Sequence, residues 1–159
     1  MGCKPRIVVL GAILALLLVP RVVHARIWYI KSDGTGDAAT IQAGIDSAQA
    51  GDEVVLASGV YTWSSQGGRT GFRVARLGHG NVLRGEFGPE STIIDGEYLG
   101  GVFSGLDVGA VRIENLTIRN GLPYGGGNGG AIALSGNSHL RTREKIIDTR
   151  GVFHAMLAG

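Results

Sequence analysis

The stretch "DGTGDAATIQAGIDSAQAGDEVVLASGVY", from Asp33 to Tyr61, decides how this chain folds, because it places one short helix before a strand-rich remainder. Small and apolar residues recur there at spacings of three and four, which predicts an amphipathic helix over residues 38–50. Asp37 is the predicted N-cap, and Gly51 is the predicted stop. The apolar face comprises Ala38, Ile41, Ile45 and Ala48, and Gly44 beside it would let the helix approach a neighbour closely. The apolar face of this helix must pack against another element, and no second helix is predicted downstream to serve as that element.

The remainder of the chain reads as short apolar strands separated by glycine-rich turns. Glycine supplies 28 of the 159 residues, against an ordinary share of about 7%. The sharpest internal similarity matches "TIIDG" (92–96) to "TIRNG" (117–121), position by position. Each copy is a strand followed by Asp or Asn and then Gly, which tolerate the left-handed backbone of a sharp turn. Other strand-like runs are "EVVLASGVY" (53–61), "NVLRGEFG" (81–88), "VRIEN" (111–115) and "AIALSG" (131–136).

Short strands grouped in units of about 20 to 30 residues predict a solenoid, in which stacked coils bury a shared apolar interior. The alternative is a β-sandwich, which needs tight hairpins between equal alternating runs. Asp95-Gly96 and Asn120-Gly121 lead into glycine-rich segments instead. We therefore predict an all-β fold, a parallel β-helix stub of about three to four coils. The helix would cap the open first coil, with Ile41 and Ile45 pointing inward.

At this point the sequence resembles a known group of proteins. The "DGTGD" to "SGVY" stretch, "LRGEFGPESTIIDG" and "LTIRNG" followed by "GGGNGGAIAL" are similar to the N-terminal part of right-handed parallel β-helix proteins of the pectin-lyase-like superfamily. The "DGTGD…TIQAGID" segment is also similar to the start of pectin methylesterases. The resemblance covers about residues 28–136 and implies a right-handed solenoid with an N-terminal helix.

The resemblance also implies chemistry on acidic polysaccharides. Lyases of this superfamily use calcium held by carboxylates together with an arginine base, and the esterases use paired aspartates with an arginine. No position of this chain matches those motifs, so the catalytic residues stay unknown and calcium is a cofactor by resemblance alone. The fold by itself does not assign an activity.

The segment over residues 1–25 predicts a secretory signal peptide. Lys4 and Arg6 precede an uncharged apolar run over residues 7–19, and "VHA" places Ala25 before the predicted cleavage point. An uncleaved anchor is the alternative, but the run is shorter than the roughly 20 residues of a membrane-spanning helix. The mature chain, residues 26–159, would then have no membrane span. We expect it to be secreted, to the extracellular space or the surface of a bacterial cell envelope.

Removal of this segment changes the composition of the chain. The single cysteine, Cys3, is lost, so the mature protein would have no disulfide. Loss of Lys4, Arg6 and Arg21 from the 15 basic residues leaves 12 against 13 acidic ones, a net charge of −1. The sequence has no stripe of basic residues with aromatic residues between them, so nucleic-acid binding is not expected.

A few polar residues are candidates for a site. Asp33 and Asp37 could supply oxygen ligands to calcium, although a turn and a helix cap explain both. Asp95 and Asn120 are expected to be stacked turn residues. His79, His139 and His154 lack the spacing of metal ligands. A sugar-stacking surface, with core packing as the alternative, would use Tyr61, Trp63, Phe72 and Tyr124.

From His139 the turn-strand rhythm changes. We therefore divide the mature chain into a cap and coils, residues 26–138, and a divergent tail, residues 139–159, that is distinct, truncated or frame-shifted. An uncapped last coil would offer strand edges for self-association. The predicted function is association with polysaccharide, acidic polysaccharide being the expected partner, or degradation of pectin-type polymers by a full-length form. The alternatives are a non-catalytic adhesion solenoid at the cell surface and a truncated product without activity of its own.

Cleavage after Ala25 is directly testable. Export of the full chain from a host cell should yield a protein whose first residue is Arg26, because the apolar run is long enough for a leader and too short for an anchor. N-terminal sequencing of the exported material checks this. Exported protein that still begins at Met1 would contradict it.

Overall fold

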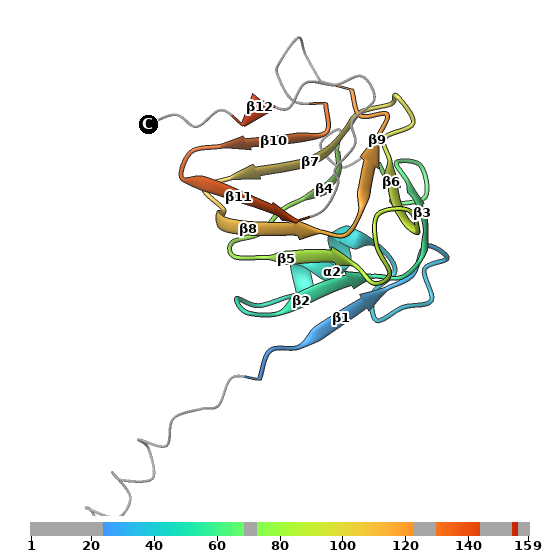
Figure 1. The fold of residues 1–159 in the computed structure, drawn as a ribbon, viewed down its shortest axis with the longest axis horizontal. Coiled ribbons are helices and arrows are strands. Elements are labelled where there is room, and N and C mark those ends of the chain that lie inside the picture. The colour runs from blue at the N-terminus through green and yellow to red at the C-terminus, as the bar shows by residue number, and fades with distance from the viewer. Residues whose placement is uncertain (1–23, 69–72, 123–129, 144–153, 156–159) are drawn as a thin grey trace, which may run out of the picture.

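The computed structural model describes residues 24–68, 73–122, 130–143 and 154–155, which form a solenoid of parallel strands (Figure 1). The strands are β1 (Ile27–Ile30), β2 (Glu53–Leu56), β3 (Gly59–Thr62), β4 (Arg73–Arg76), β5 (Val82–Gly85), β6 (Thr92–Asp95), β7 (Gly101–Leu106), β8 (Gly109–Glu114), β9 (Thr117–Arg119), β10 (Ile132–Ser135), β11 (Ser138–Arg143) and β12 (His154–Ala155). The helix of the described residues is α2 (Ile41–Ser47).

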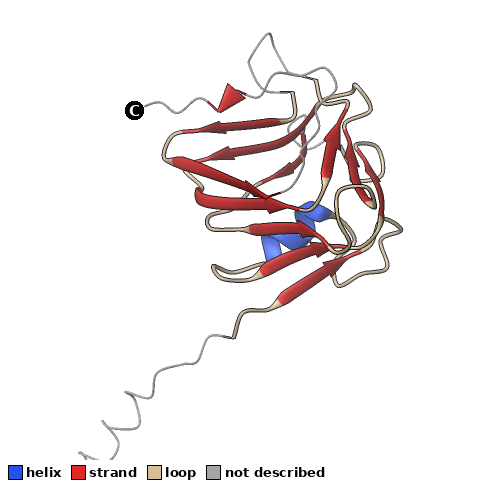
Figure 2. Ribbon diagram, viewed as in Figure 1, coloured by secondary structure: helices blue, strands red, loops and turns tan. Residues whose placement is uncertain are grey.

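The strands lie in three parallel sheets, and each of the three coils from β2 to β10 adds one strand to each sheet (Figure 2). Sheet A has the order β1-β2-β5-β8-β11, sheet B the order β3-β6-β9, and sheet C the order β12-β10-β7-β4. Three coils run through β2-β3-β4, β5-β6-β7 and β8-β9-β10, and β11 and β12 belong to a further one. The predicted parallel β-helix with an N-terminal helix is confirmed.

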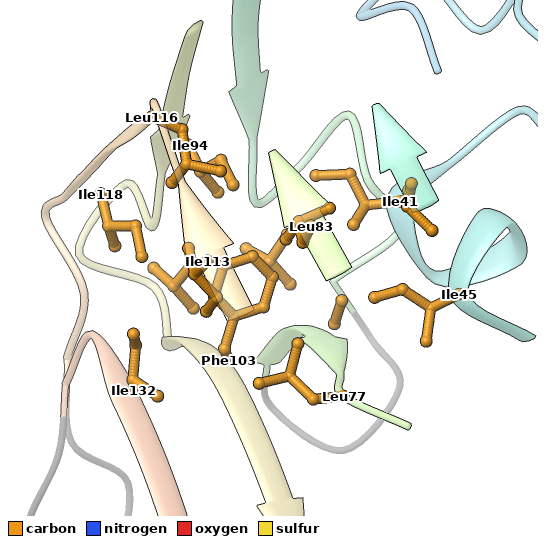
Figure 3. Close-up of a cluster of buried hydrophobic side chains, with 14 of the residues drawn as sticks. Ile41, Ile45, Leu77, Leu83, Ile94, Phe103, Ile113, Leu116, Ile118 and Ile132 are labelled. Carbon is orange, nitrogen blue, oxygen red and sulfur yellow. The ribbon is translucent and has the colours of Figure 1, made fainter. Parts of the chain in front are cut away.

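Apolar side chains stacked in columns fill the interior. Strand register places equivalent residues of successive coils above one another, so each buried side chain packs on the coils before and after it. Figure 3 shows Leu83, Phe103 and Ile113 converging in this interior. The inward columns are Val54, Leu83 and Ile113 in sheet A, Tyr61, Ile94 and Ile118 in sheet B, and Ala75, Phe103 and Ile132 in sheet C.

Helix α2 covers the open end of this interior, as predicted. It packs against β1, β2 and β4, and both Ile41 and Ile45 are buried. Gly44 gives the predicted close approach, because a Cβ there would lie 2.8 Å from the Ile30 Cδ1 atom. The backbone N–H of Ile41 donates to Oε1 of buried Gln66 at 2.8 Å, which ties the start of the helix to the first coil.

The predicted bounds of the helix were wrong at both ends. Thr40, not Asp37, is the N-cap, and its side chain accepts from the Ala43 N–H at 3.1 Å. Ala38 instead forms a parallel bridge with Ile30, so the segment just before the cap is held by β1. At the other end Ala48 is extended, with φ −75° and ψ 138°, because the chain must turn toward β2.

The observed strand register differs by one position from the sequence alignment of the internal repeat. Identity matching aligns Ile93 with Ile118, but in the structure Ile94 lies beside Ile118 and Ile93 beside Thr117. A shift by one position exchanges the two faces of a strand, so burial of Ile94 decides the register. In the turn that follows, Asn120 has the expected left-handed backbone, at φ 54°, whereas Asp95 still belongs to β6.

Strand pairing continues past the predicted boundary at His139. Ser138–Arg143 pairs with β8 along its whole length, from Ser138 beside Gly109 to Arg143 beside Glu114. The start of the predicted tail, residues 139–143, therefore belongs to β11. Most of the rest of that tail lies outside the described residues.

Burial of Ile45 predicts the effect of a charge at the cap. Ile45→Asp should lower the free energy of unfolding by several kcal/mol, because an unpaired carboxylate would lie against the apolar interior. Ser47→Asp adds the same charge on the exposed side of α2 and should cost under about 1 kcal/mol. Urea unfolding of both variants measures the difference. Equal losses would show that α2 does not cap the interior.

Candidate functional site

The two calcium candidates both lie in the segment between β1 and α2, and each accepts a hydrogen bond from the protein. Oδ1 of Asp33 accepts from the Thr35 N–H at 3.0 Å and from the Thr35 hydroxyl at 2.8 Å, and these bonds hold the pKa of Asp33 below its ordinary value. Oδ2 of Asp37 accepts from the Tyr29 N–H at 2.8 Å. Both carboxylates thus shape the turn into α2, and calcium there stays a prediction.

Asp95 and Asn120 contact each other between successive coils, but they are not the expected stacked turn residues, because Asp95 ends β6 and pairs with Arg119. Nδ2 of Asn120 donates to Oδ1 of Asp95 at 2.9 Å, and Nε of Arg119 donates to Oδ2 at 2.7 Å. Burial alone would raise the pKa of Asp95. The Glu97 N–H, the Asn120 amide and the Arg119 guanidinium outweigh burial and hold that pKa below its ordinary value. All these partners belong to the chain, so the pair holds the B–C corner of the solenoid together.

The predicted aromatic surface is not formed by Tyr61. Its ring is fully buried in the sheet B column, and its hydroxyl lies 2.8 Å from the Ile30 carbonyl oxygen and 3.0 Å from that of Ala57. Burial raises the pKa of this phenol. Trp63 is partly buried against the core, in keeping with the packing alternative. Phe72 and Tyr124 lie outside the described residues.

The histidines do not form a cluster in the described structure. His79 lies in the turn before β5, against Gly109, and His139 is exposed on β11. Within residues 24–143, gaps excepted, no group of three or more His, Cys, Asp or Glu side chains could hold a metal ion. Only the backbone of His154 is described.

A cluster of arginines on the outer face of sheet A was not predicted from the sequence. Alternate strand residues point outward, and the register aligns Val82, Arg112 and Arg141 in one column. The neighbouring column contains Arg84, Glu114 and Arg143. At about 4.8 Å per strand, these charges repeat closely along the solenoid axis.

Among the described residues of this face, the charges are balanced on β2 and β5 and unbalanced toward β11. Nε of Arg84 contacts Oε2 of Glu53 at 2.9 Å, so those charges offset each other. On β8, Nε of Arg112 contacts Oε1 of Glu114 at 3.5 Å, with nearly half of the arginine side chain exposed. Both arginines of β11 are also exposed.

These side chains surround a hollow of about 330 Å³, lined by Arg112, Glu114, Arg141, Thr142 and Arg143. We call it the arginine hollow. Among the described residues that line it, three guanidinium groups stand against one carboxylate, which is a charge of +2. The sequence did contain a signal, since "RIE" at 112–114 and "RTR" at 141–143 both have charged residues at alternate positions. Only the strand register shows that the two segments are neighbours.

No known protein family, curated protein or solved structure matches this chain. In the described part of the chain, no helix has both the length and the apolar character needed to cross a membrane.

The lowered pKa of Asp95 predicts acid sensitivity. A carboxylate with a lowered folded-state pKa contributes stability above its unfolded pKa of about 3.9, and this is lost as the pH falls through the folded value. Asp95→Asn should therefore be less stable than the native chain at pH 7, and the difference should shrink below about pH 4. Urea unfolding across the acid to neutral range measures it. A difference that is independent of pH would contradict the role given to the charged form.

Proposed function

We propose that this chain is an exported β-helix domain that binds acidic polysaccharide on the outer face of sheet A. The observation that carries the proposal is the arginine hollow, where the described lining residues have a net charge of +2 on an exposed surface. The N-terminal leader pattern supports export, and the resemblance of the turn motifs to pectin-lyase-like proteins supports a polysaccharide partner. The proposal concerns binding, since no residue of this chain is assigned a catalytic role.

The chemistry of the hollow suits a polymer that carries carboxylates. Guanidinium groups form planar, two-pronged hydrogen bonds with carboxylates, a geometry that ammonium groups lack. Arg112 and Arg141 stand on adjacent strands of one column, and Arg143 stands beside Glu114 in the next. A chain with repeated carboxylates can contact more than one of these groups at once, so weak contacts add up. The carboxylate of Glu114 would repel anions with a higher density of negative charge and so disfavour their binding.

The hollow is also wide and open, with side chains that reach solvent. Exposed charge pairs are weakened by salt, so the affinity should be modest and should fall with ionic strength. These features favour reversible attachment to a polymer over enclosure of a small ligand.

Binding to polygalacturonate tests the proposal. Arg141→Glu combined with Arg143→Glu should weaken binding at least about tenfold at low salt, because attraction becomes repulsion at two positions. Arg76→Glu changes an exposed arginine on sheet C and should bind like the native chain. Affinity electrophoresis or calorimetry supplies the measurement, with a neutral glucan as the polymer control.

Two outcomes would overturn the proposal. One is a native chain that binds neither polymer, and the other is a double variant that binds polygalacturonate as well as the Arg76→Glu protein does. Retained far-ultraviolet circular dichroism of the double variant shows that the solenoid is intact.

A further inference from the structure

The start of β1 is held by a carboxylate from the neighbouring strand. The backbone N–H of Arg26 donates to Oδ1 of Asp52 at 2.8 Å. Oδ2 of Asp52 accepts from the Gln49 N–H at 2.9 Å and from the Trp28 indole at 3.4 Å. Asp52 is 6% exposed, so it is a nearly buried acceptor with donors from β1 and from the segment after α2.

The position of Arg26 is fixed in further ways. Its carbonyl oxygen accepts from the Glu53 N–H at 2.9 Å, and its guanidinium lies 3.7 Å from the centre of the Trp28 ring. The residues before it, His24 and Ala25, are exposed and lie outside any helix or strand. The Ala25–Arg26 peptide bond is therefore accessible, and its nitrogen lies in a defined place.

This is the bond that the leader pattern predicts to be cut. We propose that removal of residues 1–25 creates an α-ammonium group on Arg26 that pairs with Asp52, so that maturation locks the first coil. Hydrolysis by a leader-removing protease consumes one water and breaks the Ala25–Arg26 C–N bond. The hydroxyl goes to the Ala25 carbonyl carbon, which leaves as a carboxylate, and the Arg26 nitrogen becomes an amine that takes up a proton at neutral pH.

The pocket is suited to an ammonium group before cleavage takes place. A hydrogen bond between two charged groups is stronger than one from a neutral amide to the same carboxylate. The N–H groups of Gln49 and Arg26 hold the pKa of Asp52 below its ordinary value, so the carboxylate is already ionised at neutral pH. Of the charged groups in the described structure, the Arg26 guanidinium lowers the pKa of Asp52 further, and Glu53, next in the chain, is paired with Arg84.

The contacts of Asp52 join three parts of the first coil. Asp52 connects the start of β1 through Arg26 and Trp28, the exit from α2 through Gln49, and the start of β2 by its own place in the chain. A precursor would therefore have a looser first coil than the mature chain. This inference depends on cleavage after Ala25 and is independent of polymer binding.

The test compares three forms of one protein. Residues 26–159, which contain every described strand, are produced behind a fusion partner that a protease removes so that Arg26 is the first residue. Urea unfolding is measured on the fusion, on the released chain, and on the released chain after its α-amine is acetylated. The unfolding equilibrium constant of the released chain should be about three- to tenfold smaller than that of the acetylated chain at low salt.

Asp52→Asn provides the partner variant. It should abolish the difference between the free and the acetylated chain, whereas Asp46→Asn, which removes an exposed carboxylate from α2, should retain it. If Asp52→Asn does not fold, the rate of α-amine acetylation in the native chain decides the question. The pKa of the α-amine should then lie above the ordinary value of about 7.7.

The stability that the α-amine contributes should change with pH in a defined direction. An α-amine whose pKa is raised by folding contributes stability below its unfolded pKa of about 7.7, and this contribution is lost as the pH rises through the folded value. Equal stability of the free and acetylated chains, an α-amine with an ordinary pKa, or a difference that persists in Asp52→Asn would each overturn the proposal.

Discussion

Stacking of one coil on the next is the interaction on which the rest of this structure depends. A short strand such as β5 buries too little apolar surface to be stable alone, and it gains that surface only from the coils on either side. The column of Tyr61, Ile94 and Ile118 shows the principle in sheet B. Every interior side chain packs on a neighbouring coil. The first coil has no such neighbour on one side, so another element must cover its apolar interior. Helix α2 covers it by placing Ile41 and Ile45 where a preceding coil would otherwise be required.

One face of each strand forms the core, and the other face is available for function. Inward residues such as Leu83 and Ile113 are restricted to apolar types, but their outward neighbours carry no such restriction. Sheet A uses this freedom to place charges at regular intervals. Near the cap, Glu53 and Arg84 offset each other, whereas toward β11 arginines outnumber carboxylates among the described residues of the hollow. The proposed binding face is thus a product of register, since segments from successive coils, well separated in the sequence, become neighbours.

The sequence was informative where one periodicity dominated and less so where tertiary contacts intervened. The helix and the parallel coils were predicted, because spacings of three and four and recurring strand-turn units are local signals. The cap residue was missed because Ala38 bridges to Ile30, which leaves Thr40 as the first residue free to cap. The repeat register was missed because Ile93 and Ile94 are both apolar, so either could have faced inward. The arginine hollow was missed because no local pattern reveals which strands are adjacent.

The uneven length of the coils has a consequence for how such a chain can change. Within sheet B, Gly59 pairs with Thr92 and Ile93 pairs with Thr117, so the first of these coils spans a longer stretch of sequence than the second. The longer coil has shorter strands and longer connecting segments, and the paired strands stay aligned. Insertions and deletions in these connecting segments therefore have little effect on the packing of the interior side chains. A lineage of such proteins can exchange whole loops while it conserves its columns, and an engineer can graft a new loop at a corner without redesigning the core.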